Sequence, residues 1–483
     1  MVRFIDLFGS MARVIPTVKS PDRKVQFREK LGWTIVVLLL FLLMSNIPLY
    51  GISASNTIDY LYWMRVILAS THGTLMELGI GPIVTAGLIM QLLAGSKIIK
   101  IDLNNPDDRS KFTASQKSLA MVMTGIQAAA YILSGAYGVG LPLSNQILVF
   151  LQLLVAGLIV VLLDEMTQKG WGLGSGISLF IVANVSQQIM WRALSPVTNS
   201  GDVYWIGAVF ATFQSLASGG LQGLGKVFWS RPGEGGSTLG LFVTIIVFVV
   251  VIYFETYRVN IPLQYAKYRG FRGSYPIKLL YVSNIPVILV QSLFATLLFW
   301  TQIFAKYNTG SATNPWLNLL AIFKKNVDPT SGNITYQPIG GLVYYITPPQ
   351  GILAVLNDPV QAVIYLTLMV LLCAGFAKIW VELSGIAPRD IADQLYSSGM
   401  QIPGFRRSPV IMEQVLQRYI PVVALLGGMI VGLLAVLADF FGALGTGMGV
   451  LLTVGIIYQL YQTIAQEQMA DMHPAIRGML GAR

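Results

Sequence analysis

Long, uninterrupted apolar runs constrain this chain more than any other feature of its sequence. The run TLGLFVTIIVFVVVIYF, from 238 to 254, contains no charged residue. A helix needs about 20 apolar residues to cross the bilayer core, and only helices and closed barrels satisfy their backbone there. The runs do not alternate with polar residues, so we predict membrane-spanning helices. The charged fraction agrees, at 11% of the chain against about 25% in soluble domains.

We expect ten spans and one half-inserted segment. The segment at 52–70 is apolar on one side, but Asp59 and Arg65 interrupt it and it is too short to cross. Residues 1–30 form a polar, basic stretch that we expect to be a cytoplasmic amphipathic segment. The ten expected spans are 31–49, 78–94, 116–134, 146–166, 174–194, 238–257, 286–307, 359–383, 419–440 and 447–466.

The span count predicts the architecture. Ten spans divide into five plus five, and an odd number in each half makes the halves face opposite ways, which suits an inverted repeat with a site between them. We therefore predict an all-α polytopic membrane protein, with two inverted five-helix halves (31–195 and 238–466) around a central pore. The halves are joined by an external hinge loop at 196–237, and 467–483 is a tail. Basic residues gather on the side that carries both termini, which the positive-inside rule assigns to the cytoplasm.

The polar residues do not predict catalysis. The two histidines, His72 and His473, lack a companion at metal-ligand spacing, and Cys373 is a lone cysteine. No catalytic residue, metal or cofactor is therefore predicted. The acids Glu77, Asp164, Glu165, Glu255 and Asp439 lie at the ends of spans. A secondary transporter of a small solute, also built on inverted repeats, is the alternative function, but it predicts charges deeper in the membrane.

Two long cytoplasmic loops, 258–284 and 385–418, are the remaining candidates for binding. The first alternates apolar and polar residues around Gly and Pro, which predicts a protruding hairpin. Both loops carry basic residues, and together they indicate a large anionic partner, because phosphate is contacted by Lys and Arg.

Several motifs, taken together, resemble one known family. They are GIGPIVTAGLIMQLL (79–93), GLGSGISLF (172–180), YPIKLLYVSNIPVIL (275–289), GFRRS (404–408), RYIP (418–421) and GALGTGMGVLLTV (442–454). In this order they resemble the SecY family of protein-conducting channels, the alpha subunits of Sec translocons, over essentially the whole chain and in an archaeal style. The resemblance implies a pore-forming subunit, not an enzyme, that passes unfolded secretory proteins across the membrane and releases transmembrane segments into lipid.

The resemblance also implies roles for individual residues. An apolar gasket, here the pore ring, closes the pore, and a plug at about 56–69 blocks its outer side. A polar set, here the gate cluster, lies at the lateral gate, and arginines dock the ribosome. The implied pore ring is Ile80, Val84, Ile177, Ile181, Ile288 and Leu452; the gate cluster is Thr85, Gln127 and Thr296; the docking residues are Arg269, Arg406 and Arg407.

The implied partners are SecE-like and SecBeta-like small single-span subunits, the ribosome, signal peptides and nascent chains, and membrane lipid. The implied location is the plasma membrane, as a multi-pass protein with both termini in the cytoplasm.

Overall fold

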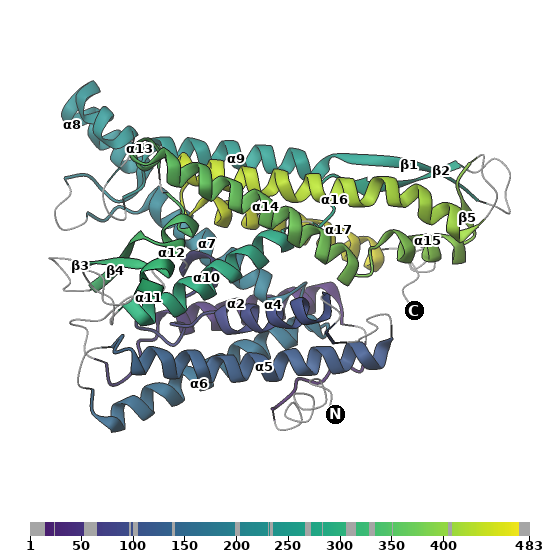
Figure 1. Cartoon of the computed structure of the whole chain (residues 1–483), viewed down its shortest axis with the longest axis horizontal. Helices are drawn as coiled ribbons and strands as arrows, with labels where there is room; N and C mark the ends of the chain where they lie inside the picture. Colours follow the sequence, from purple (N-terminus) through teal and green to yellow (C-terminus); the bar gives the residue numbers. More distant parts are fainter. Residues whose placement is uncertain are drawn as a thin grey trace.

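The chain is a mostly helical bundle whose longest helices run along the long axis of the molecule (Figure 1). The computed structural model describes residues 15–23, 25–52, 65–95, 98–99, 105–137, 141–198, 203–229, 231, 235–265, 272–282, 284–305, 315–327, 334–349, 351–403 and 408–472. The helices are α2 (Phe27–Asn46), α3 (Arg65–Leu68), α4 (Gly81–Gly95), α5 (Pro106–Leu133), α6 (Leu143–Gln168), α7 (Gly176–Leu194), α8 (Ala208–Phe228), α9 (Thr238–Thr256), α10 (Ile285–Ala305), α11 (Pro315–Leu320), α12 (Leu342–Ile346), α13 (Ile352–Asn357), α14 (Pro359–Leu383), α15 (Pro388–Ser397), α16 (Pro409–Phe440) and α17 (Gly447–Met472).

Each expected span overlaps one of these helices, and within the described ranges five helices are long and apolar enough to cross a membrane: α6, α9, α14, α16 and α17. Some helices begin before the expected span because polar turns add to their first part. Helix α5 begins at Pro106 rather than 116, because Asn105 caps it by accepting from the Asp107 N–H at 3.1 Å. Helix α16 begins at Pro409 rather than 419. Hydropathy marks only the apolar part of such helices.

Two small sheets qualify the all-α expectation. The strands are β1 (Arg258–Tyr265), β2 (Arg272–Lys278), β3 (Ile322–Val327), β4 (Ile334–Gly340) and β5 (Met400–Gln401). β1 and β2 form the hairpin predicted for the first basic loop, and β5 from the second loop joins the same sheet, with Gln264 opposite Gln401. The hairpin of β3 and β4 was not predicted. A strand of two residues such as β5 is too short to show an alternating pattern in the sequence, because it is defined only by its pairing with β1.

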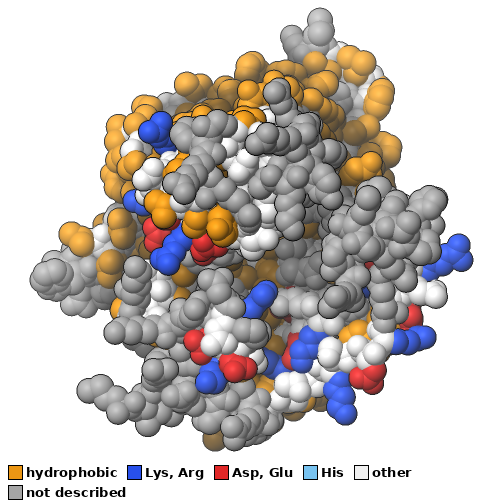
Figure 2. Space-filling view, turned by 90° about the vertical axis from the view of Figure 1, so that its right-hand side faces the viewer, with side chains coloured by type: hydrophobic (Ala, Val, Ile, Leu, Met, Phe, Trp, Pro, Cys, Tyr) orange, Lys and Arg blue, Asp and Glu red, His pale blue; other side chains and the backbone are white. Residues whose placement is uncertain are grey.

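The molecule has two distinct ends (Figure 1). We call one the hairpin end, which carries β1, β2, β5 and α15, and the other the α8 end, which carries α8, α13 and the β3–β4 hairpin. Helix α2 begins and helix α17 ends at the hairpin end, where Lys30 Nζ and Glu467 Oε1 pair at 2.6 Å. Viewed onto this end, Lys and Arg side chains are exposed together with Asp and Glu, while hydrophobic side chains lie mainly over the upper part of the view (Figure 2).

Two turns of similar sequence, LGSG at 173–176 and LGTG at 444–447, are held in the same way. The N–H of Leu173 donates to Thr34 Oγ1 of α2 at 2.9 Å. The N–H of Leu444 donates to Thr244 Oγ1 of α9, also at 2.9 Å. Each threonine hydroxyl in turn donates to a carbonyl of its own helix. A threonine of α2 therefore supports the first turn, and a threonine of α9 supports the second.

The helix that follows each turn is capped by an aspartate of the helix before it. Asp164 Oδ1 of α6 accepts from the N–H of Ile177 in α7 at 3.1 Å. Asp439 Oδ1 of α16 accepts from the N–H of Gly447 in α17 at 2.6 Å. A carboxylate suits this position because helix N-termini carry unpaired N–H groups and positive potential. The two turns thus share one local plan in chain segments far apart.

Candidate pore and gate

Gly79 allows the short helix α3 to pack against the start of α4. Its φ is +54°, and a Cβ there would lie 2.1 Å from the carbonyl oxygen of Leu68. The next residue, Ile80, donates its N–H to that same oxygen at 2.8 Å. Any side chain at Gly79 would therefore collide with α3 and would also strain the backbone. The unusual glycine-rich start of this span positions Ile80 beside α3.

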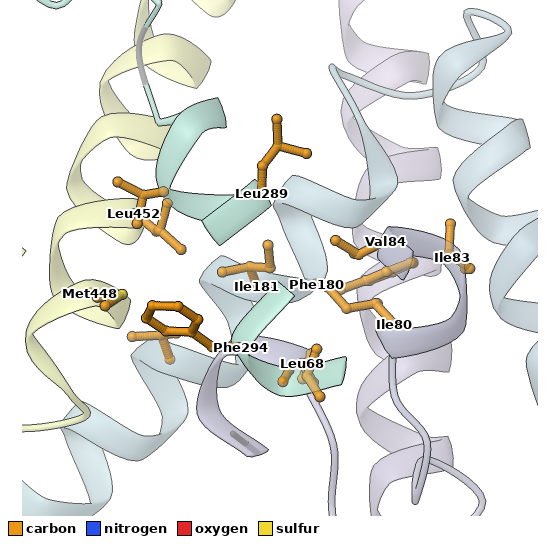
Figure 3. Packing of buried hydrophobic residues seen from close by; sticks show 14 of the residues in the cluster. Leu68, Ile80, Ile83, Val84, Phe180, Ile181, Leu289, Phe294, Met448 and Leu452 are labelled. Carbon is orange, nitrogen blue, oxygen red and sulfur yellow. The ribbon is translucent and has the colours of Figure 1, made fainter. Parts of the chain in front are cut away.

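Residues of the pore ring come together in one buried apolar cluster. Ile80 and Val84 of α4, Ile181 of α7 and Leu452 of α17 are all buried, and Ile177 and Ile288 pack against the cluster while partly exposed. Figure 3 shows labelled ring residues from α4, α7 and α17 in one region. A constriction of aliphatic side chains excludes water and ions by dewetting. This centre is thus suited to seal a pore.

The cluster also contains residues that the sequence reading missed. Phe294 of α10 is 2% exposed and Met448 of α17 is 1% exposed, and Leu68 of α3 lies beside Ile80 (Figure 3). Phe180 of α7 stacks on Phe41 of α2, with ring centroids 4.6 Å apart. The apolar character of these residues indicated that they are buried, but the sequence did not indicate which helices pack together.

The gate cluster is brought together in part. Thr85 Oγ1 of α4 lies 3.4 Å from Thr296 Oγ1 of α10, and Thr296 donates to its own helix at Ser292 O, at 2.7 Å. Thr85 is therefore the donor of the long bond between the helices. Gln127 of α5 is buried one turn away, where its Oε1 would lie 3.8 Å from a Cβ on Gly81. Polar side chains thus line the contacts of α4 with both neighbours.

A buried ionic cluster, missed by the sequence reading, ties α3 to the connection before α4. We call Arg65, Ser70, His72 and Glu77 the plug latch. Arg65 Nη2 lies 2.9 Å from Glu77 Oε1, and Arg65 Nη1 donates to Ser70 Oγ at 3.0 Å. His72 Nδ1 lies 2.9 Å from Arg65 Nη2 and 3.2 Å from Glu77 Oε1. Opposite charges on both sides of a short turn were the available signal.

Electrostatics make the latch strong. The Glu77 side chain is fully buried, and burial alone would raise its pKa, but Arg65 and His72 hold the pKa at about 2. The second carboxylate oxygen accepts from the N–H of Gly73. Asn184 of α7 also donates to the carbonyl of Arg65 at 3.2 Å, so the latch contacts the helix that carries Ile181.

The remaining predicted sites lie largely outside the described residues. These are Arg269, Arg406, Arg407 and residues 56–64 of the predicted plug, whose last part includes α3. In the described ranges, no group of three or more His, Cys, Asp or Glu could hold a metal ion.

The bundle, with five described helices long and apolar enough to cross a membrane, defines a class, that of helical membrane proteins. Comparison with known proteins is more specific. The SecY family model matches residues 74–461, and the model for the plug domain of Sec61p matches 39–73. The protein translocase subunit SecY of Pyrococcus furiosus is 45% identical, over 99% of both chains.

Solved structures agree. A structure described as a protein-conducting channel has a TM-score of 0.79 and 37% identity, covering 96% of this chain and 98% of the other. Sec61 in the canine ribosome-channel complex from the endoplasmic reticulum has a TM-score of 0.76 and 37% identity, with the same coverage. The chain belongs to the SecY family.

Proposed function

We propose that this chain forms the pore of a protein translocase, through which unfolded secretory proteins cross the membrane and from which transmembrane segments leave sideways into lipid. The observation that carries the proposal is the convergence of apolar side chains from α4, α7, α10 and α17 on one buried centre. A gasket of this kind moulds around a passing peptide without binding ions. The glycine-dependent contact of α3 below it would let a plug stabilise the closed state.

The ten-span, two-half architecture is part of the proposal. Its support is the shared plan of the turns at 173–176 and 444–447, each held by a threonine of the first span of its half and followed by a helix with an aspartate cap. In an inverted repeat, span five of one half corresponds to span five of the other. α7 and α17, which follow these turns, both contribute to the pore ring.

We place the hairpin end in the cytoplasm, with both termini. The ion pair of Lys30 with Glu467 supports a common side for the two termini, and the cations of Figure 2 follow the positive-inside rule. We infer the plasma membrane as the location.

Ribosome docking is proposed for the two basic loops at this end. β1 pairs with both β2 and β5, so strands from the two basic loops lie in one sheet. A separate apolar core, including Ile261, Ile277 and Leu395, fastens this sheet to α15 and α16. Arg269 lies in the first loop, and Arg406 and Arg407 lie in the second. The related Sec61 channel was solved in a ribosome complex.

The buried acids argue against the alternative of an ion-coupled solute transporter. Glu77 pairs with Arg65, and Asp164 and Asp439 cap helices. These structural roles use three of the four buried carboxylates in the described part of the chain, and the fourth, Glu255, lies in the last turn of α9 rather than deep in a span.

Cross-linking tests the proposal. A cysteine in place of Ile181 should form a disulfide with a single cysteine in a secretory chain stalled on a ribosome, because the chain must pass the ring. Cys373, the native cysteine, is buried and is replaced by Ala first. Leu151 of α6, which is 54% exposed to the surroundings of the bundle, is the matched control position. Equal cross-linking at both positions, or none at Ile181 during active translocation, would contradict the proposal.

The same preparation checks the partners. SecE-like and SecBeta-like small subunits should co-purify with the chain in mild detergent, together with bound signal peptide when export is stalled.

A further inference from the structure

A polar cavity of about 120 Å³ lies at the α8 end. It is lined by the last turn of α7, the loop between α8 and α9, and the turn between α16 and α17. One water needs only about 10–15 Å³ of such space, so the cavity has room for a larger polar group. None of the residues given roles in the pore, gate or latch lines it.

Cationic groups dominate this cavity. Arg192, in the last turn of α7, lines it half-buried, and within the part of the chain that the structure describes its guanidinium makes no ion pair or hydrogen bond. Arg231 also lines it and is held in place by carbonyl groups, with Nη1 2.6 Å from Trp205 O and Nη2 3.1 Å from Tyr204 O. A half-buried cation without a partner is costly, so the site favours an anion.

Two helix N-termini also border the cavity. Ser237, which lines the cavity, caps α9 by accepting from the Gly240 N–H at 3.0 Å. Thr446, also in the lining, accepts from the Gly449 N–H of α17 at 3.1 Å. Helices of this length carry partial positive charge at their first turn and bind anions there. The cavity therefore brings together Arg192, which has no partner in the described part of the chain, and the starts of two long helices, of which α17 is capped by the Asp439 carboxylate.

The acid among the described lining residues, Asp439, already caps a helix. Asp439 is 3% exposed, and its Oδ1 accepts from the N–H of Gly447 at 2.6 Å. It serves the start of α17, and among the described residues it is not within ion-pair distance of either arginine.

The surroundings identify the depth of the cavity in the membrane. Trp229 in its lining and Trp191 next to Arg192 are 52% and 50% exposed, and tryptophans of this kind collect at the headgroup level of bilayers. Directly after Ser237, helix α9 exposes Phe242, Ile245 and Ile246 along its length. A lipid with its headgroup in the cavity could lay its acyl chains on this surface.

We propose that this cavity binds a phosphate group, with the headgroup of an anionic lipid in the outer leaflet as its source. Arg192 supplies the main positive charge, and the N–H groups of its planar guanidinium match the spacing of two phosphate oxygens. The cavity is lined by α7 from one proposed half and by the α16–α17 turn from the other. A bound headgroup therefore braces the junction of the halves on the side opposite the hairpin end.

Native mass spectrometry of the delipidated full-length protein, titrated with phosphatidylglycerol or phosphatidylcholine in mixed micelles, tests the site. Arg192→Gln should weaken binding of phosphatidylglycerol about tenfold, as for the loss of one charge-assisted hydrogen bond, and leave phosphatidylcholine unchanged. Arg192→Lys keeps the charge and should retain most of the affinity. Lys324→Gln, an exposed cation on β3 at the same end and outside the cavity, is the matched control and should behave as wild type.

Inorganic phosphate, titrated alone, separates the two sources. Binding of free phosphate that is lost in Arg192→Gln, with no difference between the lipids, supports the phosphate site and excludes the headgroup. Equal phosphatidylglycerol affinity in wild type and Arg192→Gln, with no phosphate binding, overturns the proposal. An equal loss in Lys324→Gln also overturns it, because it would show general surface attraction. A thermal melt of each variant confirms that the fold is intact.

Discussion

Breaking the plug latch should open the resting channel. Glu77→Gln keeps the shape of the side chain and removes the charge that compensates Arg65. Holding the pKa of a fully buried carboxyl at about 2, against 4.5 for the free group, corresponds to about 3 kcal/mol. Breaking a buried ion pair from one side costs about 3–5 kcal/mol, in the same range. If α3 leaves this site when the pore opens, the closed state loses about 3 kcal/mol relative to the open state.

A loss of this size raises the open fraction about a hundredfold. The assay is resting ion conductance of the purified channel in planar bilayers, without a substrate chain. Glu165→Gln is the matched control, because Glu165 pairs with Lys117 at 2.6 Å and Lys169 at 2.8 Å next to the N-terminal segment, away from the latch. Unchanged conductance in Glu77→Gln, or an equal rise in Glu165→Gln, would refute the reasoning. A lower melting temperature without higher conductance would show that the pair stabilises open and closed states alike.

The pH dependence of the wild type follows from the same pKa. Since the pKa of Glu77 is lowered in the folded protein, its contribution is complete above about 4.5 and is lost only as the pH falls towards 2. Resting conductance should therefore stay flat from pH 7 to pH 5. A rise within that interval would mean that the latch is not held by this carboxylate.

Four further outcomes are expected. Serine at the pore-ring positions of α4 and α7 should make resting bilayers leak ions, and unchanged conductance would refute the gasket. Leucine at Thr85 and Gln127 should reduce export of proteins with weak signal peptides and spare strong ones; equal export of both classes would contradict this. Glutamate at Arg269 and Arg406 should weaken ribosome co-sedimentation and reduce the slope of log affinity against log salt by roughly 0.7–0.9 for each lost phosphate contact; wild-type binding at every salt concentration, or an equal loss in an Arg389→Glu control on α15, would refute docking. Thr34→Val and Thr244→Val should each lower the free energy of unfolding by about 1–3 kcal/mol, by leaving a buried N–H unpaired; a loss no larger than that of the exposed Thr256→Val in thermal melts would contradict it.

The apolar runs predicted the helices well, because a bilayer imposes a minimum length on every span. The range 359–383 agrees with α14 at both ends. The predicted ring residues on α4, α7 and α17, taken from motifs that carry the family resemblance, lie in or against the main apolar cluster, and their role as a ring stays a prediction. Residues buried in one cluster need only be apolar, so the motifs could not reveal that Phe294 and Met448 fill the same centre.

Contacts between distant segments were not predictable from the sequence. In the sequence, Arg65 is a charged residue that interrupts an apolar stretch, and Glu77 is an acid at the end of a span. Only the fold of the turn between them shows that the two charges pair. The same holds for Thr34 and Thr244, which look like ordinary polar residues in a span. Their value depends on an N–H supplied by a turn more than a hundred residues away. Hydropathy reports how strongly a residue prefers an apolar environment. The roles of these residues depend instead on the groups that they contact in the folded chain.

The two parts of the closed centre therefore contribute in different ways to holding it shut. The ring has no directional bonds, so a passing peptide can replace the contacts that its side chains lose, and opening costs little dispersion energy. The latch is directional and buried, and no passing chain can replace the pairing of Arg65 with Glu77. In the proposed mechanism, a signal peptide that displaces α3 must then supply about 3 kcal/mol through its own burial, which roughly 120 Å² of apolar surface provides. A single large apolar side chain is close to that threshold, so small changes in signal hydrophobicity should decide whether the channel opens.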